Sequence, residues 1–134
     1  MTVPFPHKEL SRPVVAIIGG GFTGAALAYH LAGLVRAEAV RIVVYEPRAN
    51  LGGGLAYDTA EPVHRINVPA SRMSLIPSEG SHFQDWLVET GALDDDADAT
   101  TPDGHVFARR SVFGRYVAAQ LQPLLAAGVV EHHR

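Results

Sequence analysis

The sequence predicts an α/β fold that begins with a βαβ unit, and three patterns lead to this prediction. An apolar, β-branched run at residues 13–18 ends at a glycine cluster and is typical of a buried strand. Leucines at helical spacing follow over about residues 22–35, and a second β-branched run occupies residues 40–46. Strand, helix and strand in this order form the βαβ unit.

The turn between the first strand and the helix has the spacing Gly-x-Gly-x-x-Gly. Gly19 permits the tight turn, Gly21 lets the backbone approach a ligand closely, and Gly24 lets the helix lie near the sheet. Phe22 and Thr23 open the helix, whose first N–H groups have no partners within the helix and attract phosphate. The pattern indicates a pyrophosphate site, although an ordinary glycine-rich turn is the alternative.

An acidic residue follows at the distance that dinucleotide-binding folds require. Glu46 closes the second strand and lies 22 residues after Gly24. That is close to the roughly 20 residues expected for a carboxylate that accepts hydrogen bonds from a ribose. An acid at a strand end is also explained by simple solvation. Together with the glycines, Glu46 predicts a Rossmann-like, dinucleotide-binding βαβ fold.

A second glycine cluster, at residues 52–54, follows Glu46 after Pro47 and Arg48. Glycines there let the chain pass an extended dinucleotide again without obstruction, and a flexible glycine loop is the alternative. Here the sequence resembles the FAD-binding oxidoreductases that share the glycine fingerprint, the acid and a following Gly-Gly. The resemblance implies that the dinucleotide is FAD rather than NAD and that Pro47, Arg48 and Gly53 lie beside it.

The resemblance continues through residues 53–58, 64–74, 83–87 and 110–116. These segments resemble the N-terminal FAD/NAD(P)-binding region of a family that includes FAD-dependent urate hydroxylase-like proteins and flavin-dependent N-hydroxylating monooxygenases. The resemblance covers nearly all of residues 13–128. It implies that NAD(P)H reduces FAD and that reduced flavin activates oxygen to hydroxylate a small-molecule substrate. The chain has no cysteine, so it lacks the cysteine pair of the disulfide-reductase branch.

The long polar segment at residues 47–79 is a second candidate region, because loops of this length are usually functional. Asn67 or Arg72 is expected to contact the flavin ring or the phosphates, although hydrogen bonds within the loop explain them equally well. No catalytic residue is assigned, since a flavin performs the redox chemistry while the protein supplies position and exclusion of water. The seven histidines have no metal-ligand spacing, so no metal site is predicted.

Local patterns also predict how the helices pack. Leu27, Leu31 and Leu34 form a stripe that is expected to face the core, with Tyr29 and His30 on the surface or flank. A capping box of Ser81 and Gln84 is expected to open a helix that runs to about residue 90. Trp86 in this helix is interpreted as a core residue in preference to one that stacks on a cofactor.

The rest of the chain is predicted to contain a linker, a helix and a strand. The acidic run at residues 94–98 is interpreted as a solvated linker, because it lacks the pattern of a calcium loop, and the pair Arg109-Arg110 is likewise expected to be solvated. Ser111 is expected to cap a helix from about residue 112 that Pro123 kinks or ends. Its buried side comprises Phe113, Val117, Leu121 and Leu124. A strand is expected after Gly128.

Composition limits the possible functions. The 134 residues suffice for one domain, and a net charge of −3 lacks the basic excess of a nucleic-acid binder. No apolar run is long enough to span a bilayer and no secretory signal is present, so we expect a cytoplasmic protein. Residues 1–12 are expected to be a disordered leader. Residues 13–134 are expected to form an FAD/NAD(P)-binding domain that is a truncated, N-terminal portion of a larger two-dinucleotide-binding fold, completed by a missing C-terminal portion or by a complementing chain.

The leading hypothesis is the FAD-binding N-terminal segment of an FAD/NAD(P)-dependent oxidoreductase of monooxygenase type. One alternative is an NAD-binding dehydrogenase domain, which would use only the first glycine cluster. The other is a non-catalytic dinucleotide-binding module, which would show no NAD(P)H-dependent flavin reduction.

Overall fold

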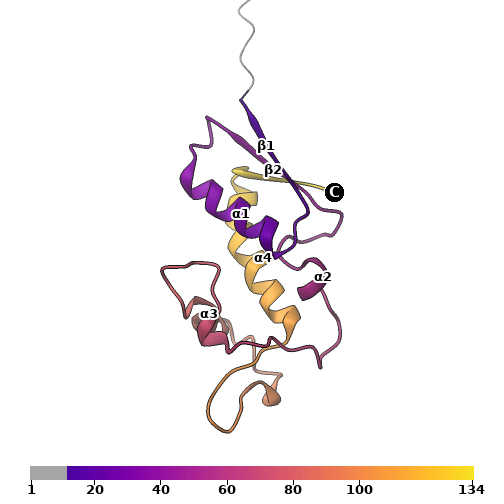
Figure 1. Cartoon of the computed structure of the whole chain (residues 1–134), viewed down its shortest axis with the longest axis vertical. Helices are drawn as coiled ribbons and strands as arrows, with labels where there is room; N and C mark the ends of the chain where they lie inside the picture. Colours follow the sequence, from indigo (N-terminus) through magenta and orange to yellow (C-terminus); the bar gives the residue numbers. More distant parts are fainter. Residues whose placement is uncertain (1–11) are drawn as a thin grey trace, which may run out of the picture.

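The computed structural model describes residues 12–134, so the expected leader, residues 1–12, lies outside the described residues except for Arg12. Figure 1 shows the strands at one end of the molecule, with α4 running from them toward the other end and α1 beside it. In chain order the elements are β1 (Val14–Ile18), α1 (Phe22–Leu34), β2 (Arg41–Tyr45), α2 (Gly54–Tyr57), η1 (Ala70–Arg72), α3 (His82–Thr90), η2 (Ala97–Ala99), α4 (Arg110–Ala126) and β3 (Val130–His133).

The three strands are parallel and lie in the order β1-β2-β3. Parallel neighbours need crossover connections, which are supplied by α1 between β1 and β2 and by the segment that ends in α4 between β2 and β3. The predicted α/β, Rossmann-like fold is therefore confirmed. The expected last strand is present as well, because Gly128 with a φ of +67° turns the chain from α4 into β3.

The core lies between one face of the sheet and the helices. From the sheet, the core contains Ile17, Ile42, Val44 and Val130. Because side chains alternate between the two faces of a strand, Val14, Ile18 and Tyr45 belong to the opposite face, where they are exposed. Within residues 12–134, no strand pairs with the outer edge of β1. Among residues 12–134, β1 is therefore an edge strand, and its Val14, Val15 and Ile18 side chains are all exposed.

The helix α1 packs through small residues, and the predicted leucine stripe is wrong for two of its three members. Leu27 and Leu34 are 52% and 84% exposed, whereas Ala25 and Ala28 are fully buried. Partly buried residues flank this small face, namely Leu31, Tyr29 and His30. Tyr29 and His30 thus lie on the flank of the helix, as expected.

Because α1 lies close to the sheet, alanines rather than leucines form the buried face of the helix. A Cβ atom at Gly24 would collide with the carbonyl oxygen of Gly19 and would lie 3.3 Å from Ile17 Cγ2. The first turns of α1 therefore rest almost directly on β1, and larger side chains do not fit between them.

The helix α3 begins after Ser81 without the predicted capping box. The Ser81 hydroxyl donates to Asp85 Oδ2 at 2.9 Å, and its oxygen accepts no backbone N–H, because Ser81 (φ −91°, ψ 1°) lacks the extended backbone typical of an N-cap residue. Gly91, with a φ of +62°, ends the helix. Trp86 packs against the core, with its ring 5.6 Å from that of Tyr116, as expected for a core residue.

Asp96 is buried, so the prediction of a solvated acidic linker is wrong at this position. Its side chain lies 2.7 Å from Arg65 Nη2 and 3.4 Å from Arg109 Nε, and hydrogen bonds from Arg65 hold the pKa of its carboxyl below the ordinary value. Arg110 Nε donates to the carbonyl of Arg65 at 3.1 Å. The pair Arg109-Arg110 therefore fastens two loops together and is not simply solvated. The other aspartates of the run, Asp94, Asp95 and Asp98, are exposed.

The helix α4 is longer than predicted at both ends. It begins at Arg110, and the Ser111 side chain caps no backbone N–H. Pro123 does not end it, since the helix continues to Ala126 although the proline has no N–H to donate to the carbonyl four residues earlier. On the predicted buried side, Phe113, Val117 and Leu121 are buried and Leu124 is partly buried.

The contact between α1 and β1 gives a stability prediction. Gly24→Ala is expected to destabilise the fold by about 1–3 kcal/mol or more, because the added methyl group overlaps backbone atoms that cannot rotate away. The measurement is the free energy of unfolding in urea. Gly33→Ala, in the same helix but with open space around it, is the control and is expected to stabilise by about 0.5–1 kcal/mol. Equal unfolding free energies for the two variants would contradict the close approach.

Candidate functional site

The conformation of the backbone shapes the turn between β1 and α1. Gly19 has a φ of +95°, which favours glycine, and its N–H donates to the carbonyl of Tyr45 at 2.9 Å. Gly21 is the N-cap of α1 and provides no side-chain cap. The first N–H groups of α1 are therefore free of side-chain partners at the positive end of the helix dipole, where they favour an anion.

The second glycine cluster packs directly against the first. The N–H of Gly52 donates to the carbonyl of Gly20 at 2.7 Å. A Cβ at Gly54 would lie 2.8 Å from Gly21 Cα, whereas a Cβ at Gly21 would lie 3.5 Å from Gly54 Cα. Only glycine therefore fits at position 54, while position 21 has room for one methyl group. This backbone contact explains the glycine at position 54, while the contact alone does not require glycine at position 21.

The two clusters line one open recess of about 710 Å³, which we call the glycine recess. This volume lies within the roughly 300–1,000 Å³ typical of cofactor sites. Six of the residues predicted from the sequence line it, namely Gly19, Gly21, Phe22, Thr23, Gly24 and Gly53. The remaining walls come from β1, from Leu27 of α1 and from Gly54–Tyr57. The recess therefore joins an uncapped helix N-terminus to an apolar strand.

Glu46 closes β2 behind this recess and is only 4% exposed. Its Oε2 accepts the N–H of Gly20 at 2.9 Å, and its Oε1 accepts the backbone N–H and Nη1 of Arg48 at 2.9 and 3.2 Å. The N–H groups of Arg48 and Gly20 hold the pKa of Glu46 below its ordinary value, against the effect of burial. Glu46 thus ties the glycine turn to the end of β2, and its hydrogen bond to a ribose stays a prediction.

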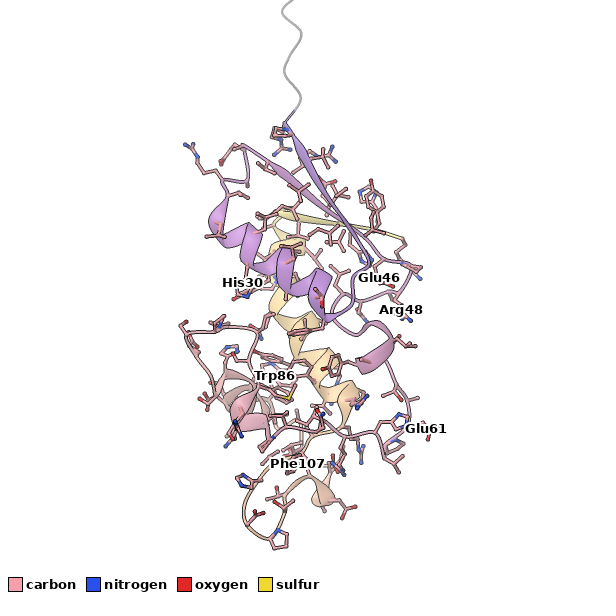
Figure 2. The ribbon with its side chains drawn as sticks, in the orientation of Figure 1. His30, Glu46, Arg48, Glu61, Trp86 and Phe107 are labelled. Carbon is pink, nitrogen blue, oxygen red and sulfur yellow. The ribbon has the colours of Figure 1, made fainter. Side chains whose placement is uncertain are left out.

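Three other predicted residues lie outside the glycine recess. Figure 2 shows Arg48 beside Glu46, next to α2, and its Nε lies 3.2 Å from Asp58 Oδ2. Pro47 is exposed, and its carbonyl accepts Arg134 Nε at 3.2 Å. Asn67 is exposed and lines no part of the recess. Contacts of these residues with a cofactor therefore remain predictions.

The sequence named Phe22 and Phe113 separately but did not predict that their rings meet that of Tyr57 at the recess. The ring of Phe22 lies 6.3 Å from that of Tyr57 and 5.6 Å from that of Phe113, and the last two rings are 4.8 Å apart. They join the start of α1, α2 and the first turns of α4. Aromatic side chains are expected to pack against other residues, but only the tertiary fold shows that these three rings contact one another.

The fold and the recess define an α/β protein with a glycine turn of the dinucleotide-binding type. Residues 16–134 match the model of the FAD-NAD(P)-binding family, and the chain belongs to that family. A search of curated proteins finds no significant match. Among the helices of residues 12–134, none combines the length and the apolar character needed to cross a bilayer.

The hydrogen bonds of Glu46 give a prediction for stability and pH. Because its pKa is lower in the folded protein, its contribution is present above the ordinary value of 4.5 and is lost as the pH falls through the folded value. Glu46→Gln is expected to lower the free energy of unfolding by about 1–3 kcal/mol at pH 7. It is also expected to weaken the loss of stability between pH 5 and pH 3, measured by urea unfolding at each pH.

Two other carboxylates bear on this measurement, one as a further source of acid sensitivity and one as a control. Hydrogen bonds from Arg41 lower the pKa of Glu131 to about 2, so the variant retains some acid sensitivity from this pair. Glu38, whose exposed side chain is 3.8 Å from Arg36, provides the control variant Glu38→Gln, which is expected to behave as the wild type. A Glu46→Gln protein with the same acid profile as Glu38→Gln would contradict the role of Glu46.

Proposed function

We propose that this chain is the FAD-binding part of an NAD(P)H-dependent oxidoreductase of monooxygenase type. The observation that carries the proposal is the backbone contact between Gly21 and Gly54 at the uncapped start of α1. A cofactor phosphate needs close access to backbone N–H groups, and side chains larger than glycine would fill this space. The residues present therefore fit the group.

The second glycine cluster favours FAD over NAD. The segment Gly53–Tyr57 forms a wall of the glycine recess, and this wall would be available to the part of an extended cofactor beyond its pyrophosphate. A protein that used only the first cluster would not need the close backbone contact at Gly54. The residues that would hold FAD are the glycine turn, the first N–H groups of α1 and Gly53, with Glu46 on the adenosine ribose.

When bound, FAD supplies the redox chemistry, accepting a hydride from NAD(P)H and activating oxygen once reduced. The chain's own residues position the cofactor and exclude water. The partly buried rings of Phe22 and Tyr57 pack on the buried ring of Phe113 and close the recess from the protein interior. The free N–H groups of α1 offset the negative charge of the phosphates.

Gly21→Ala tests the phosphate contact without disturbing the fold. The backbone at Gly21 (φ −65°, ψ −172°) suits any residue, and the new Cβ would lie at an ordinary 3.5 Å from Gly54 Cα. We expect wild-type stability together with an affinity for FAD that is weaker by at least about tenfold, which corresponds to about 1.4 kcal/mol. The measurement is a titration of FAD followed by its fluorescence, with Gly33→Ala as the control.

The same titration, repeated with NAD and followed by an assay of flavin reduction by NAD(P)H, separates the alternatives. Binding of NAD in preference to FAD would replace the proposal with a dehydrogenase domain. FAD binding without flavin reduction by NAD(P)H, even with candidate partner chains added, would indicate a non-catalytic module. Unchanged FAD affinity in a folded Gly21→Ala protein would overturn the phosphate contact itself.

A further inference from the structure

The loop at residues 73–81, which joins η1 to α3, is fastened to α1 and α4 at Leu75. Leu75 is 2% exposed, and both of its backbone polar groups bond to side chains. Its N–H donates to the hydroxyl of Tyr116 on α4 at 3.0 Å, and its carbonyl oxygen lies 2.9 Å from Nε2 of His30 on α1. Tyr116 is fully buried. A buried hydroxyl that has no part in the proposed FAD contacts therefore holds this loop in place.

A second histidine, His82 at the start of α3, bonds to the same hydroxyl. Its Nδ1 lies 2.7 Å from the hydroxyl oxygen of Tyr116, and the two rings are 5.5 Å apart. His82 is only partly buried, so its ring can exchange a proton with solvent. We call Leu75, Tyr116 and His82 the tyrosine latch.

The neighbours of the Tyr116 hydroxyl determine where its single hydrogen points. The N–H of Leu75 is a donor, so the hydroxyl oxygen accepts on that side. The nearby Ser74 hydroxyl already donates to the carbonyl of Ile76 and accepts its N–H, each at 2.8 Å. Among residues 12–134, His82 Nδ1 is thus the remaining acceptor for the buried hydrogen. The latch therefore requires a neutral His82 with its hydrogen on Nε2.

Protonation of His82 would place a second donor against this hydroxyl. A charged imidazole carries an N–H on both nitrogens, so the Tyr116 hydrogen would lose its acceptor inside the protein. Histidine is the side chain whose ordinary pKa brings this change between pH 5 and pH 8. His30 differs, because an Nε2–H that donates to the carbonyl of Leu75 is present in either charge state.

The ionisable groups around His82 do not compensate a charge on its ring. No ion pair within residues 12–134 includes His82, and Asp85 accepts the hydroxyl of Ser81 instead. A protonated ring would therefore have no carboxylate in contact with it. The ionisable groups on the neighbouring elements are Arg72 on η1, His30 on α1, Arg110, Arg115 and Tyr116 on α4, Glu79 in the loop, and Asp85 and Glu89 on α3 itself.

We propose that the tyrosine latch is a pH-sensitive switch. Neutral His82 holds the 73–81 loop and the start of α3 against α4, and protonation of its ring releases them. The ring of Tyr116 lies 5.6 Å from that of Phe113, which in turn packs on Phe22 and Tyr57 at the glycine recess. The latch is thus one ring away from the recess. It uses none of the residues assigned to FAD, so it stands or falls independently of the proposed function.

Amide hydrogen exchange of the full chain, followed by NMR, tests the switch. The quantity measured is the protection of the Leu75 N–H, corrected for the intrinsic exchange rate, at pH 7.5 and at pH 5.5. It is divided by the protection of the Val44 N–H in the central strand β2, so that a change in global stability cancels.

Three variants separate the histidines. His82→Asn places an oxygen that cannot be protonated where Nδ1 lies, so the Tyr116 hydroxyl keeps an acceptor. His30→Gln keeps an N–H donor for the carbonyl of Leu75. His64→Asn makes the same substitution as the first variant at an exposed histidine, whose ring bonds to Thr59 and not to the latch.

We expect the relative protection to fall by at least about tenfold from pH 7.5 to pH 5.5 in the wild type, in His30→Gln and in His64→Asn. It is expected to stay constant in His82→Asn. An unchanged value in the wild type overturns the proposal, as does an equal fall in His82→Asn. Loss of the fall in His30→Gln assigns the pH effect to His30 and likewise overturns it.

Tyr116→Phe provides a second test that does not depend on His82→Asn being folded. Without the hydroxyl, the N–H of Leu75 has lost its partner, so its relative protection is expected to be low at both pH values and equal between them. A tenfold fall that persists in Tyr116→Phe would show that the pH effect does not act through the hydroxyl, and the proposal would be wrong.

Discussion

The contact between the two glycine clusters is the constraint on which the rest of the structure depends. Gly21 and Gly54 meet backbone to backbone, and Gly52 donates to Gly20 a few residues away. A side chain at position 54 would push α2 off the glycine turn and alter the glycine recess, because Gly53–Tyr57 form one of its walls. The contact thus shapes the site without contributing any catalytic group.

Two further contacts, made by Glu46 and Gly24, hold the glycine turn in place. The buried carboxylate of Glu46 accepts the N–H of Gly20 and ties the turn to β2. Gly24 brings α1 close to β1, so that alanines form the buried face of the helix. The site therefore consists of a rigid backbone frame, which is the arrangement that preorganises N–H groups for a phosphate. Such a frame suits a family that binds FAD or NAD(P).

The sequence predicted the features that depend on local signals. The strands, the positive φ of Gly19, the start of α1 and the last strand follow from apolar runs and glycine positions, which act over a few residues. The predictions from sequence were wrong where the burial of a side chain depends on partners that are distant in the sequence. Asp96 is buried only because Arg65 lies 31 residues away in sequence and beside it in space. Leu27 is exposed because α1 lies closer to the sheet than a leucine allows.

The candidate site divides in the same way. The glycine recess was predictable because its residues form a continuous turn plus one nearby cluster. The contact between α2 and α4 was not, since Tyr57 and Gly114 are brought together only by the tertiary packing of the two helices. Glu46 was found by its spacing, but its hydrogen bonds to Gly20 and Arg48 depend on backbone geometry that spacing does not encode.

The most direct test of the central claim is an NMR titration of FAD into the ¹⁵N-labelled wild-type chain. The largest amide shifts are expected on Gly21, Phe22, Thr23 and Gly24 and on Gly53 and Gly54, because the phosphates would contact the first N–H groups of α1 beside the glycine contact. Saturating FAD that leaves these amides unchanged, while shifting others or none, would contradict the claim.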